Sequence, residues 1–464
     1  MNSTLIILLA YAVIMIAATV VFTAKGQTGD SFYVGDRNMG VIQTAMSVAA
    51  TWIWAPALFT SAEKAYSSGL PGLFYFIVPN VLCLLIFIPF ARKIRREAPE
   101  GITLSGYMGD KYESKAVRNV YHFQLSALAI LSTAVQLLAG GKVVAMLTGI
   151  PFHVCTAILA TIALSYSLIS GIRASILTDV IQMLFMLIAC IIFVPWALSL
   201  NGGIGALQFS GISGEYGSLA SEKGLDVLFS FGIPTAIGLF AGPFGDQCFW
   251  QRAFSVKKDS IGKAFVLGAV FFAVIPLSMG VLGFIAAGTG FIPADTGMVN
   301  FELIKAILPT WVIIPFLCML ISGLLSTVDS NLCAAAALST DGTDSHRTSR
   351  RRGMLAMIIF LAISILIANI PGLTVTHMFL FYGTFRASTM FPTILTLQNV
   401  KLEASGVVAG IVSALMIGIP VFTYGNLLNV AHLKTAGSLI TVFTSGIVAI
   451  AYTWYKRRKA VAAC

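Results

Sequence analysis

Three carboxylates stand inside long apolar stretches of this chain, at Asp179, Asp246 and Asp329. A charged side chain at bilayer depth costs roughly 2.5–3.5 kcal/mol on insertion scales, so it persists only where it faces protein, water or an ion. The sequence around these residues carries glycine, proline and paired hydroxyls in place of further leucine. This combination predicts a path for a small cation and a solute through a membrane.

Two stretches depart from the pattern of an ordinary membrane-spanning helix. Residues 47–56 run from small and hydroxyl residues into a proline, and residues 231–246 hold four glycines and two prolines. Proline removes a backbone donor, and a bilayer tolerates such a break only where the freed backbone is buried or lines a cavity. Two broken helices at corresponding places in two halves are typical of a transporter's binding site, although glycine and proline also serve close packing.

Oxygen atoms suited to sodium occur beside the first break and in a later segment. Sodium is a hard cation that prefers oxygen ligands, including backbone carbonyls and hydroxyls. Ala50 and Ile53 are three residues apart near the break, where carbonyls are freed. Gly323, Ser326 and Thr327 share one helical face and would supply a carbonyl and two hydroxyls. Those hydroxyls could equally bond to their own helix or join two helices, so spacing leaves both roles open.

The composition of the chain indicates where it resides. The 464 residues are 57% hydrophobic and 10% charged, against roughly 25% charge in a soluble domain. Apolar runs long enough to cross a hydrocarbon core of about 30 Å recur along the whole length. We count about thirteen, near residues 4–23, 40–62, 70–91, 119–140, 152–170, 173–199, 226–249, 262–288, 308–338, 353–370, 376–396, 405–424 and 436–455. The chain is therefore expected to be one all-α polytopic membrane protein.

The net charge of +10 is placed in a pattern that indicates topology and not nucleic-acid binding. Basic residues crowd alternate loops, namely Arg92, Lys93, Arg95 and Arg96; Lys257 and Lys258; Arg347, Arg350, Arg351 and Arg352; and Lys456, Arg457, Arg458 and Lys459. By the positive-inside rule this places the N-terminus outside and the C-terminus in the cytoplasm, as an odd number of crossings requires.

Several other classes of protein are disfavoured. The first apolar run follows no basic region and spans a bilayer, so we expect a true helix and not a cleaved signal. The seven cysteines, of which Cys464 is the last residue, show no loop spacing typical of structural disulfides. The sequence has no phosphate-binding loop, no nucleophile elbow and no Cys/His cluster with metal-ligand spacing. We therefore predict that the protein is not an enzyme and needs no obligatory protein partner.

Three motifs resemble those of the sodium:solute symporter family. Residues 170–182 (SGIRASILTDVIQ) are similar to the family signature, residues 325–330 (LSTVDS) to its sodium-site helix, and residues 244–252 (FGDQCFWQR) to its seventh segment. The similarity covers roughly segments two to eleven. It implies a leucine-transporter-like fold of about thirteen transmembrane helices with two inverted five-helix repeats.

The expected organisation is a single transmembrane domain over residues 1–464, with an extra N-terminal helix at 4–23, repeats at 40–199 and 226–396, and two C-terminal helices at 405–455. A short internal similarity agrees with the two repeats, because GIRAS at 171–175 resembles GTFRAS at 383–388, five spans later.

Carried over position by position, the resemblance implies where sodium binds. The implied ligands are the backbone carbonyls of Ala50, Ile53 and Gly323 and the hydroxyls of Ser326 and Thr327. Asp179 matches the family aspartate beside this site. Family members with two sodium sites carry hydroxyl residues one turn beyond the Ser–Thr pair, where this chain has Asp329 and Ser330.

The second carboxylate at Asp329 leaves its role open. Close to Asp179, it could hold a second sodium ion or share a proton. It could also simply hydrogen-bond to a neighbouring helix near the cytoplasmic face.

The expected solute pocket departs from that of the sugar-carrying members. It consists of three aromatic residues, two polar residues and an inner-gate aromatic, namely Trp52, Trp54, Phe76, Asp246, Gln247 and Phe249. Each unpaired hydroxyl of a buried sugar would cost about 1–3 kcal/mol, so such a pocket disfavours sugar. The tryptophans could alternatively serve only for packing.

Two kinds of solute suit an aromatic pocket with a carboxylate. Urea could stack on tryptophan while Asp246 accepts its N–H groups, or an amine could be held by charge and cation–π contact. Residues 49–56 (AATWIWAP) and 245–253 (GDQCFWQRA) are most similar to the urea and polyamine branch of the family, which favours urea.

The sequence thus predicts a sodium-driven symporter in the cell membrane, whether plasma or inner membrane, that imports a small polar solute by alternating access. Urea is the first candidate. A sodium- or proton-coupled carrier of an amine, polyamine, amino acid or monocarboxylate is the alternative, and an uncoupled solute channel is the alternative of another class. The expected partners are the solute, the sodium ion and the lipid bilayer.

Overall fold

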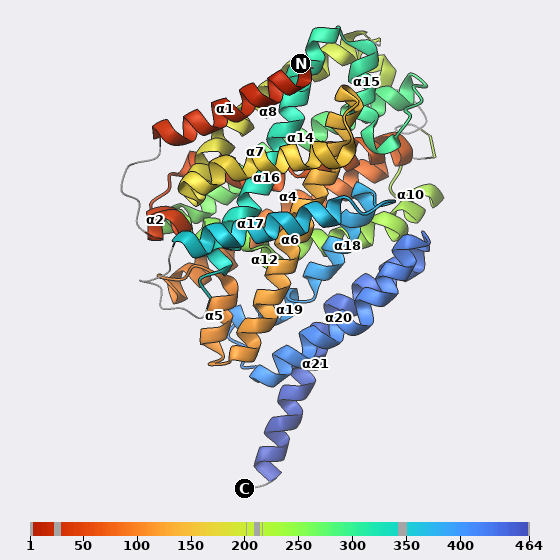
Figure 1. Ribbon diagram of the computed structural model, residues 1–464. Helices are drawn as coiled ribbons and strands as arrows, with labels where there is room; N and C mark the ends of the chain where they lie inside the picture. Colours follow the sequence, from red (N-terminus) through yellow and green to blue (C-terminus); the bar gives the residue numbers. More distant parts are fainter. Residues whose placement is uncertain are drawn as a thin grey trace.

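The computed structural model describes residues 3–22, 29–200, 202–207, 214–215, 217–341 and 350–462, and it is a bundle of helices (Figure 1). The predicted all-α class is therefore confirmed. Two residues named above, Arg347 and Cys464, lie outside the described residues.

Ten helical spans in the described part of the chain are long and apolar enough to cross a membrane. They are Pro56–Glu97 (η2 and α4), α6 (Lys115–Thr148), α7 (Phe152–Ser170), α8 (Ile172–Leu200), Glu222–Phe240 (α10, η4 and α11), Lys258–Gly288 (η5 and α14), Thr310–Leu338 (η7 and α16), α17 (Arg350–Ala368), α20 (Ala404–Leu427) and Ala431–Lys459 within α21 (Ala431–Ala462). The count of about thirteen crossings and the orientation of the termini remain predictions.

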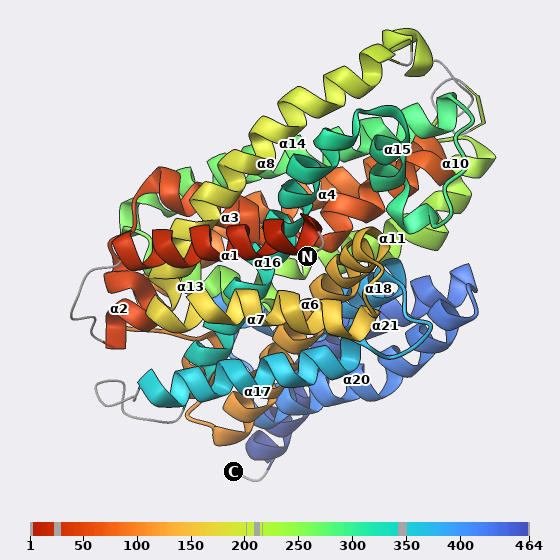
Figure 2. The ribbon, with the colours of Figure 1, turned by 45° about the horizontal axis from the view of Figure 1, so that its top comes forward.

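Further helices outside this set of ten complete the bundle. They include α1 (Ser3–Phe22), α2 (Gly29–Val34), α5 (Leu104–Lys111), α15 (Val299–Ile307), α18 (Val375–Ala387) and α19 (Met390–Leu397). Helix α1 packs on the outside of the bundle against α7 and α8 (Figure 2), and α20 packs along α21, whose last turns extend away from the other helices (Figure 1).

The first broken helix interrupts the expected second segment. Helix α3 (Val41–Trp52) ends where Ile53 leaves the helical conformation, at φ −82° and ψ 77°, and a π-helical turn η2 (Pro56–Thr60) leads into α4 (Ser61–Glu97). Pro56 has no N–H group to continue the ladder. The backbone N–H groups of Ala57 and Leu58 both donate to the carbonyl of Trp54, at 2.9 and 3.3 Å. The carbonyls of residues 50–53 therefore lie beside a gap in the helix.

The second broken helix follows from the glycines and prolines of residues 231–246. A π-helical turn η4 (Leu228–Gly232) continues into α11 (Ile233–Phe240), and a short turn α12 (Gly242–Gly245) precedes Asp246, whose backbone is extended. Helix α13 (Gln247–Ser255) then begins. The prediction of two interrupted helices is confirmed.

The two breaks lie next to each other. A Cβ atom on Gly242 would stand 2.3 Å from the ring of Trp52 and 3.2 Å from the guanidinium carbon of Arg386, so only glycine allows this approach. Backbone bonds from Met39 to Ser255 and from Lys257 to Met39, of 3.0 and 3.2 Å, join the start of α3 to the end of α13. The site is therefore built where the two broken helices cross.

Helix α18 reaches this crossing through a glycine contact with α11. A Cβ atom on Gly238 would lie 2.7 Å from the Cα atom of Gly383, which is backbone and cannot turn aside. We expect Gly238→Ala to push α18 away and to lower the free energy of unfolding by about 1–3 kcal/mol. Thermal melting in detergent measures this effect. Gly205→Ala is the matched control, because a Cβ atom there meets nothing within 4 Å, and equal melting temperatures would contradict the prediction.

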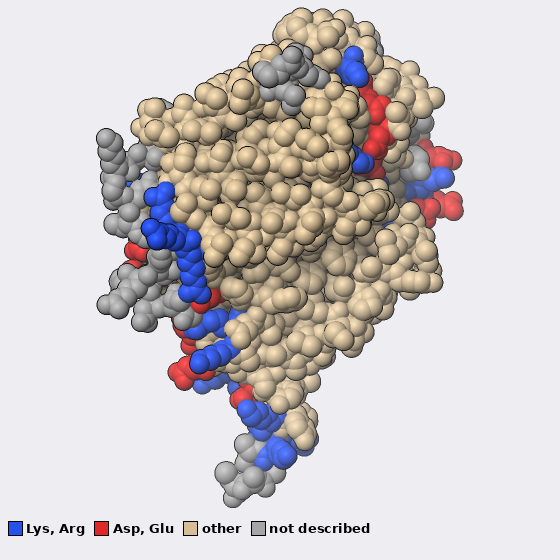
Figure 3. Space-filling model, viewed as in Figure 1, with Lys and Arg blue, Asp and Glu red and all other residues tan. Residues whose placement is uncertain are grey.

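Charged side chains gather at the margins of a broad uncharged surface (Figure 3). Lys and Arg are concentrated at the lower left of that view, over the region of α5 and the end of α21. Lys456 on α21 pairs with Glu403 at 2.8 Å, and Lys111 on α5 pairs with Glu97 at 2.8 Å. This distribution suits a multi-pass membrane protein with one strongly basic side.

Candidate functional site

The predicted sodium site lies where α16 (Ile313–Leu338) crosses the break after α3. The hydroxyl of Thr327 stands 3.2 Å from the carbonyl of Thr51 and 3.3 Å from that of Gly323. A Cβ atom on Gly323 would lie 3.2 Å from the side chain of Ile53. The structure thus brings together the break and the face of α16 that carries residues 323 and 327, and Ala50 is buried on the last turn of α3.

Ser326 faces a neighbouring cluster. Its hydroxyl donates to the Oδ1 atom of Asp179 on α8. The structure therefore places Asp179 beside the proposed sodium ligands, while the Ser326 hydroxyl is engaged by that carboxylate. Ser326 links the sodium site to the charged cluster behind it.

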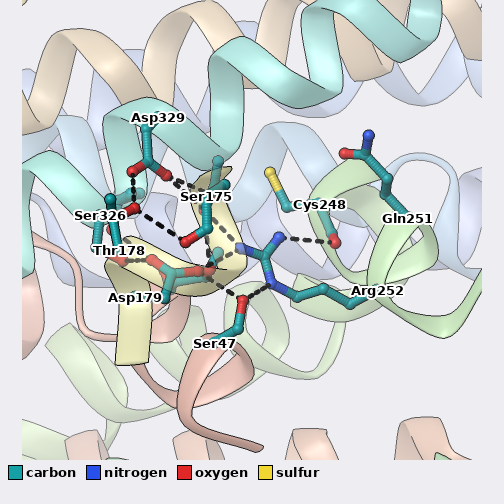
Figure 4. Close-up of polar contacts among 12 residues, drawn as sticks. Ser47, Ser175, Thr178, Asp179, Cys248, Gln251, Arg252, Ser326 and Asp329 are labelled. Carbon is teal, nitrogen blue, oxygen red and sulfur yellow. Dashed lines mark hydrogen bonds and ion pairs between the residues drawn. The ribbon is translucent and has the colours of Figure 1, made fainter. Parts of the chain in front are cut away.

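An arginine that sequence reasoning did not single out lies in the middle of this cluster (Figure 4). Arg252 extends from α13 and pairs with the Oδ2 atom of Asp179 at 3.0 Å, both side chains being fully buried. It also donates to the hydroxyls of Ser47 at 2.9 Å and Ser330 at 2.7 Å. Ser47 in turn donates to Asp179 at 2.6 Å. The guanidinium thus ties together α3, α8 and α16.

Asp329 stands at the other edge of the cluster and is held by hydroxyls (Figure 4). Ser175 donates to its Oδ1 atom at 2.8 Å, and Thr178 lies 3.2 Å from its Oδ2 atom. No basic side chain in the described part of the chain pairs with it. With Asp179 and Asp329 ionised and Arg252 charged, the cluster carries two negative charges and one positive. One further cation or proton would neutralise this buried group.

A small cavity lies at the crossing of the two breaks. Its lining residues are Thr51, Trp52, Trp54, Ser132, Asp246, Cys248, Phe249, Thr327, Asn331, Tyr382 and Arg386. Four of the six predicted pocket residues are among them. The cavity volume is about 10 Å³, which is room for a single water, so a solute enters only as the surrounding helices move. The rings of Trp52 and Trp54 stack at 6.3 Å, and Phe249 stands edge-on to Trp52 at 5.0 Å.

The other two predicted pocket residues lie elsewhere. Phe76 packs behind the cavity against Phe379, whose ring contacts Trp54 at 5.3 Å. Gln247 turns away, because its amide bonds to the backbone of Ile102 and Leu104 at 2.9 and 3.0 Å. Asp246 has an extended backbone, in which successive side chains point to opposite sides, so the side chains of Asp246 and Gln247 diverge. Gln247 instead holds the segment before α5 against α13.

Arg386 on α18 is the second functional residue that the search for carboxylates overlooked. Its Nη1 atom pairs with Asp246 at 3.2 Å, and its guanidinium lies 4.7 Å from the ring centroid of Tyr382 and 5.3 Å from that of Trp52. The hydroxyl of Tyr382 also donates to Asp246. Placing an arginine at bilayer depth carries a similar cost to placing a carboxylate there. The positions of Arg252 and Arg386 inside apolar stretches could therefore have identified both residues from the sequence.

Two larger pockets flank the cavity. One of about 440 Å³ is lined by Phe231, His377 and Leu380, at the beginning of α18. The ring of Phe379 lies between Phe231 and Trp54 and closes that side. The other, of about 890 Å³, is lined by residues that include Ile102, which Gln247 contacts. We call these two pockets vestibules, one beyond Phe379 and one beyond Gln247.

The family model described as "Sodium:solute symporter family" matches residues 32–418, most of the chain. This chain belongs to the sodium:solute symporter family. It is 23% identical to the urea-proton symporter DUR3 of Oryza sativa subsp. japonica over 92% of this chain and 66% of that protein. It is also 23% identical to the sodium/pantothenate symporter of Escherichia coli strain K12, over 92% of this chain and 91% of that protein.

Solved structures agree on the fold of this chain. A Na⁺-coupled sialic acid symporter in a substrate-bound outward-open state superposes with a TM-score of 0.76 at 18% identity, over 96% of this chain and 97% of that one. The leucine-transporter-like fold is thus confirmed, and the chain is a multi-pass membrane protein of a transporter family, not an enzyme family.

Proposed function

We propose that this symporter couples the inward movement of sodium to the import of a small polar solute, with urea as the first candidate. The observation that carries the proposal is the contact between the broken end of α3 and the Gly323–Thr327 face of α16. That contact joins freed carbonyls to a hydroxyl, which is the oxygen set that a hard alkali cation prefers.

The proposed mechanism follows from which helices share the sodium ligands. Sodium binds first and holds the end of α3 against α16, which completes the solute cavity beside Trp52 and Trp54. The vestibule beside Phe379 then closes and the vestibule near Ile102 opens. Sodium leaves through the open vestibule, and its departure releases the solute. A membrane potential contributes about 2.3 kcal/mol per charge per 100 mV, so one sodium ion supports roughly 40-fold accumulation from the potential alone.

The choice of urea rests on cavity size and aromatic walls. A cavity of about 10 Å³ must expand for any solute, and the smallest planar solute demands the least movement. Relatives named as urea transporters from rice and from Saccharomyces cerevisiae, the latter 23% identical over 84% of this chain, support the same choice. An amine is less well served, because Asp246 is already paired with Arg386.

The experiment is uptake of labelled urea into proteoliposomes with sodium outside. We expect accumulation above the external concentration, and we expect replacement of sodium by choline at constant pH to abolish it. Equilibration without accumulation would identify a channel. Accumulation that survives in choline would reject sodium as the coupling ion.

A proton at Asp329 is the second candidate for coupling, favoured by the uncompensated charge of its cluster. Asp329→Asn removes one negative charge with little change of shape. We expect this variant to keep its dependence on sodium and to lose any stimulation by an inward proton gradient, as measured by uptake across a pH series. Asp226→Asn, at an exposed position, is the control. Unchanged stimulation by protons in Asp329→Asn would exclude this role.

A further inference from the structure

Three buried hydrogen-bond donors around the cavity have no partner in the described part of the chain. They are the Nε1 atom of Trp54, the Nδ2 atom of Asn331 and the Nη2 atom of Arg386. All three residues line the cavity, and their exposed fractions are 3%, 5% and 0%. A buried donor left unpaired costs about 1–3 kcal/mol, so three around one cavity indicate a bound acceptor.

The other polar atoms of these residues are already used. Arg386 donates from Nε to the carbonyl of Gly238 and from Nη1 to Asp246. The Oδ1 atom of Asn331 accepts from the thiol of Cys248 at 3.3 Å. By contrast, the indole N–H of the adjacent Trp52 donates to the carbonyl of Asn80 at 3.1 Å. Of the two stacked tryptophans, only Trp54 therefore has an unpaired indole N–H.

The carboxylate of the cavity is engaged, in contrast to these three donors. Asp246 accepts from Tyr382 at one carboxylate oxygen and from Arg386 at the other. The charges of Asp246 and Arg386 cancel, and no other charged residue lines the cavity. A cationic solute would find neither a free carboxylate nor a net negative charge there.

The charges that line the vestibule beside Phe379 also disfavour a cationic solute. Its lining includes three lysines and two acids, namely Lys64, Lys142, Lys434, Glu63 and Asp295. Lys142 pairs with Asp295 at 3.0 Å and Lys64 with Glu63 at 3.2 Å, while Lys434 bonds to the side chain of Asn429. With His377 neutral this approach carries one excess positive charge, which disfavours cations.

We propose that the three N–H groups bind one carbonyl or carboxylate oxygen of the solute. This inference rests on the proposed function and gives the class of its solute, a small molecule with an sp² oxygen, to which urea and short monocarboxylates belong and amines do not. Trp54 lies in the break after α3, Asn331 on α16 and Arg386 on α18. One solute oxygen shared by these donors would hold three elements together as the site closes.

A ligand panel tests the oxygen directly by calorimetry on the purified protein in sodium chloride. Urea, acetamide and acetate present an sp² oxygen, whereas guanidinium is a cation with the planar shape of urea and an NH₂ group in place of the oxygen. We expect at least one oxygen-bearing solute to bind at least ten-fold tighter than guanidinium, methylamine and putrescine. Binding of acetate without urea would assign the carboxylate form, and binding of urea without acetate the neutral form. Equal binding by the two sets, or no binding by the oxygen-bearing set, would overturn the proposal.

Two variants test the donors. Trp54→Phe keeps an aromatic ring and removes the N–H group, and Asn331→Asp replaces a donor by an acceptor of the same shape. We expect each to weaken binding of the oxygen-bearing solute at least ten-fold while stabilisation by sodium in thermal melts is retained. Trp311→Phe, at an exposed tryptophan, is the matched control. Unchanged solute affinity in both variants would overturn the proposal. If wild-type protein binds these solutes but a sodium gradient does not accumulate them, the proposed function fails and the inference stands.

Discussion

Thr327→Ala is expected to abolish sodium-driven accumulation of solute. The substitution removes the one hydroxyl of α16 that reaches the backbone of α3, 3.2 Å from the carbonyl of Thr51. Without it the proposed sodium site loses a ligand, and α3 and α16 lose the hydrogen bond between Thr327 and the Thr51 carbonyl. We expect uptake in proteoliposomes, at a sodium concentration that saturates the wild type, to fall to the level measured in choline.

A matched hydroxyl separates this role from ordinary back-bonding. Thr327 also lies 3.3 Å from the carbonyl four residues earlier, and Thr161 makes the same kind of bond to Ala157 at 2.8 Å on an exposed face. Thr161→Ala should therefore leave uptake unchanged. If Thr327→Ala behaves like Thr161→Ala, the hydroxyl only supports its own helix and the sodium site is misplaced.

The pair formed by Arg252 and Asp179 gives the second large effect. Both side chains are fully buried, and removal of one partner leaves an uncompensated charge at a cost of about 3–5 kcal/mol. Arg252→Gln removes the cation that pairs with Asp179, and with both aspartates ionised it changes the charge of the cluster from −1 to −2. We expect its melting temperature in detergent to fall far below that of the wild type and its uptake to be lost.

The double variant Asp179→Asn with Arg252→Gln distinguishes the effect of the pair on stability from its effect on transport. It restores the cluster charge to that of the wild type, so we expect most of the melting temperature to return. Uptake should remain lost, because Asp179 stands beside the proposed sodium ligands and accepts from Ser326. A double variant that transports normally would show that the pair is purely structural.

Local rules made much of this protein predictable from its residues. Apolar runs of about 20 residues imply helices that span a bilayer. The lack of an N–H group on Pro56 and the glycines and prolines before Asp246 implied two helix breaks, and both occur. These features depend on residues close together in the chain, so the sequence alone determined them.

The charge partners inside the bundle were decided only by tertiary structure. Asp179 and Arg252 are 73 positions apart, and Asp246 and Arg386 are 140 apart. Their pairing depends on which helices pack together and on how each is rotated about its axis, which local spacing does not specify. The same rotation turns Gln247 toward Ile102 and away from the cavity beside Asp246. The sequence alone therefore determined the residue types and the two helix breaks. The packing of helices that are distant in the chain determined which side chains contact one another.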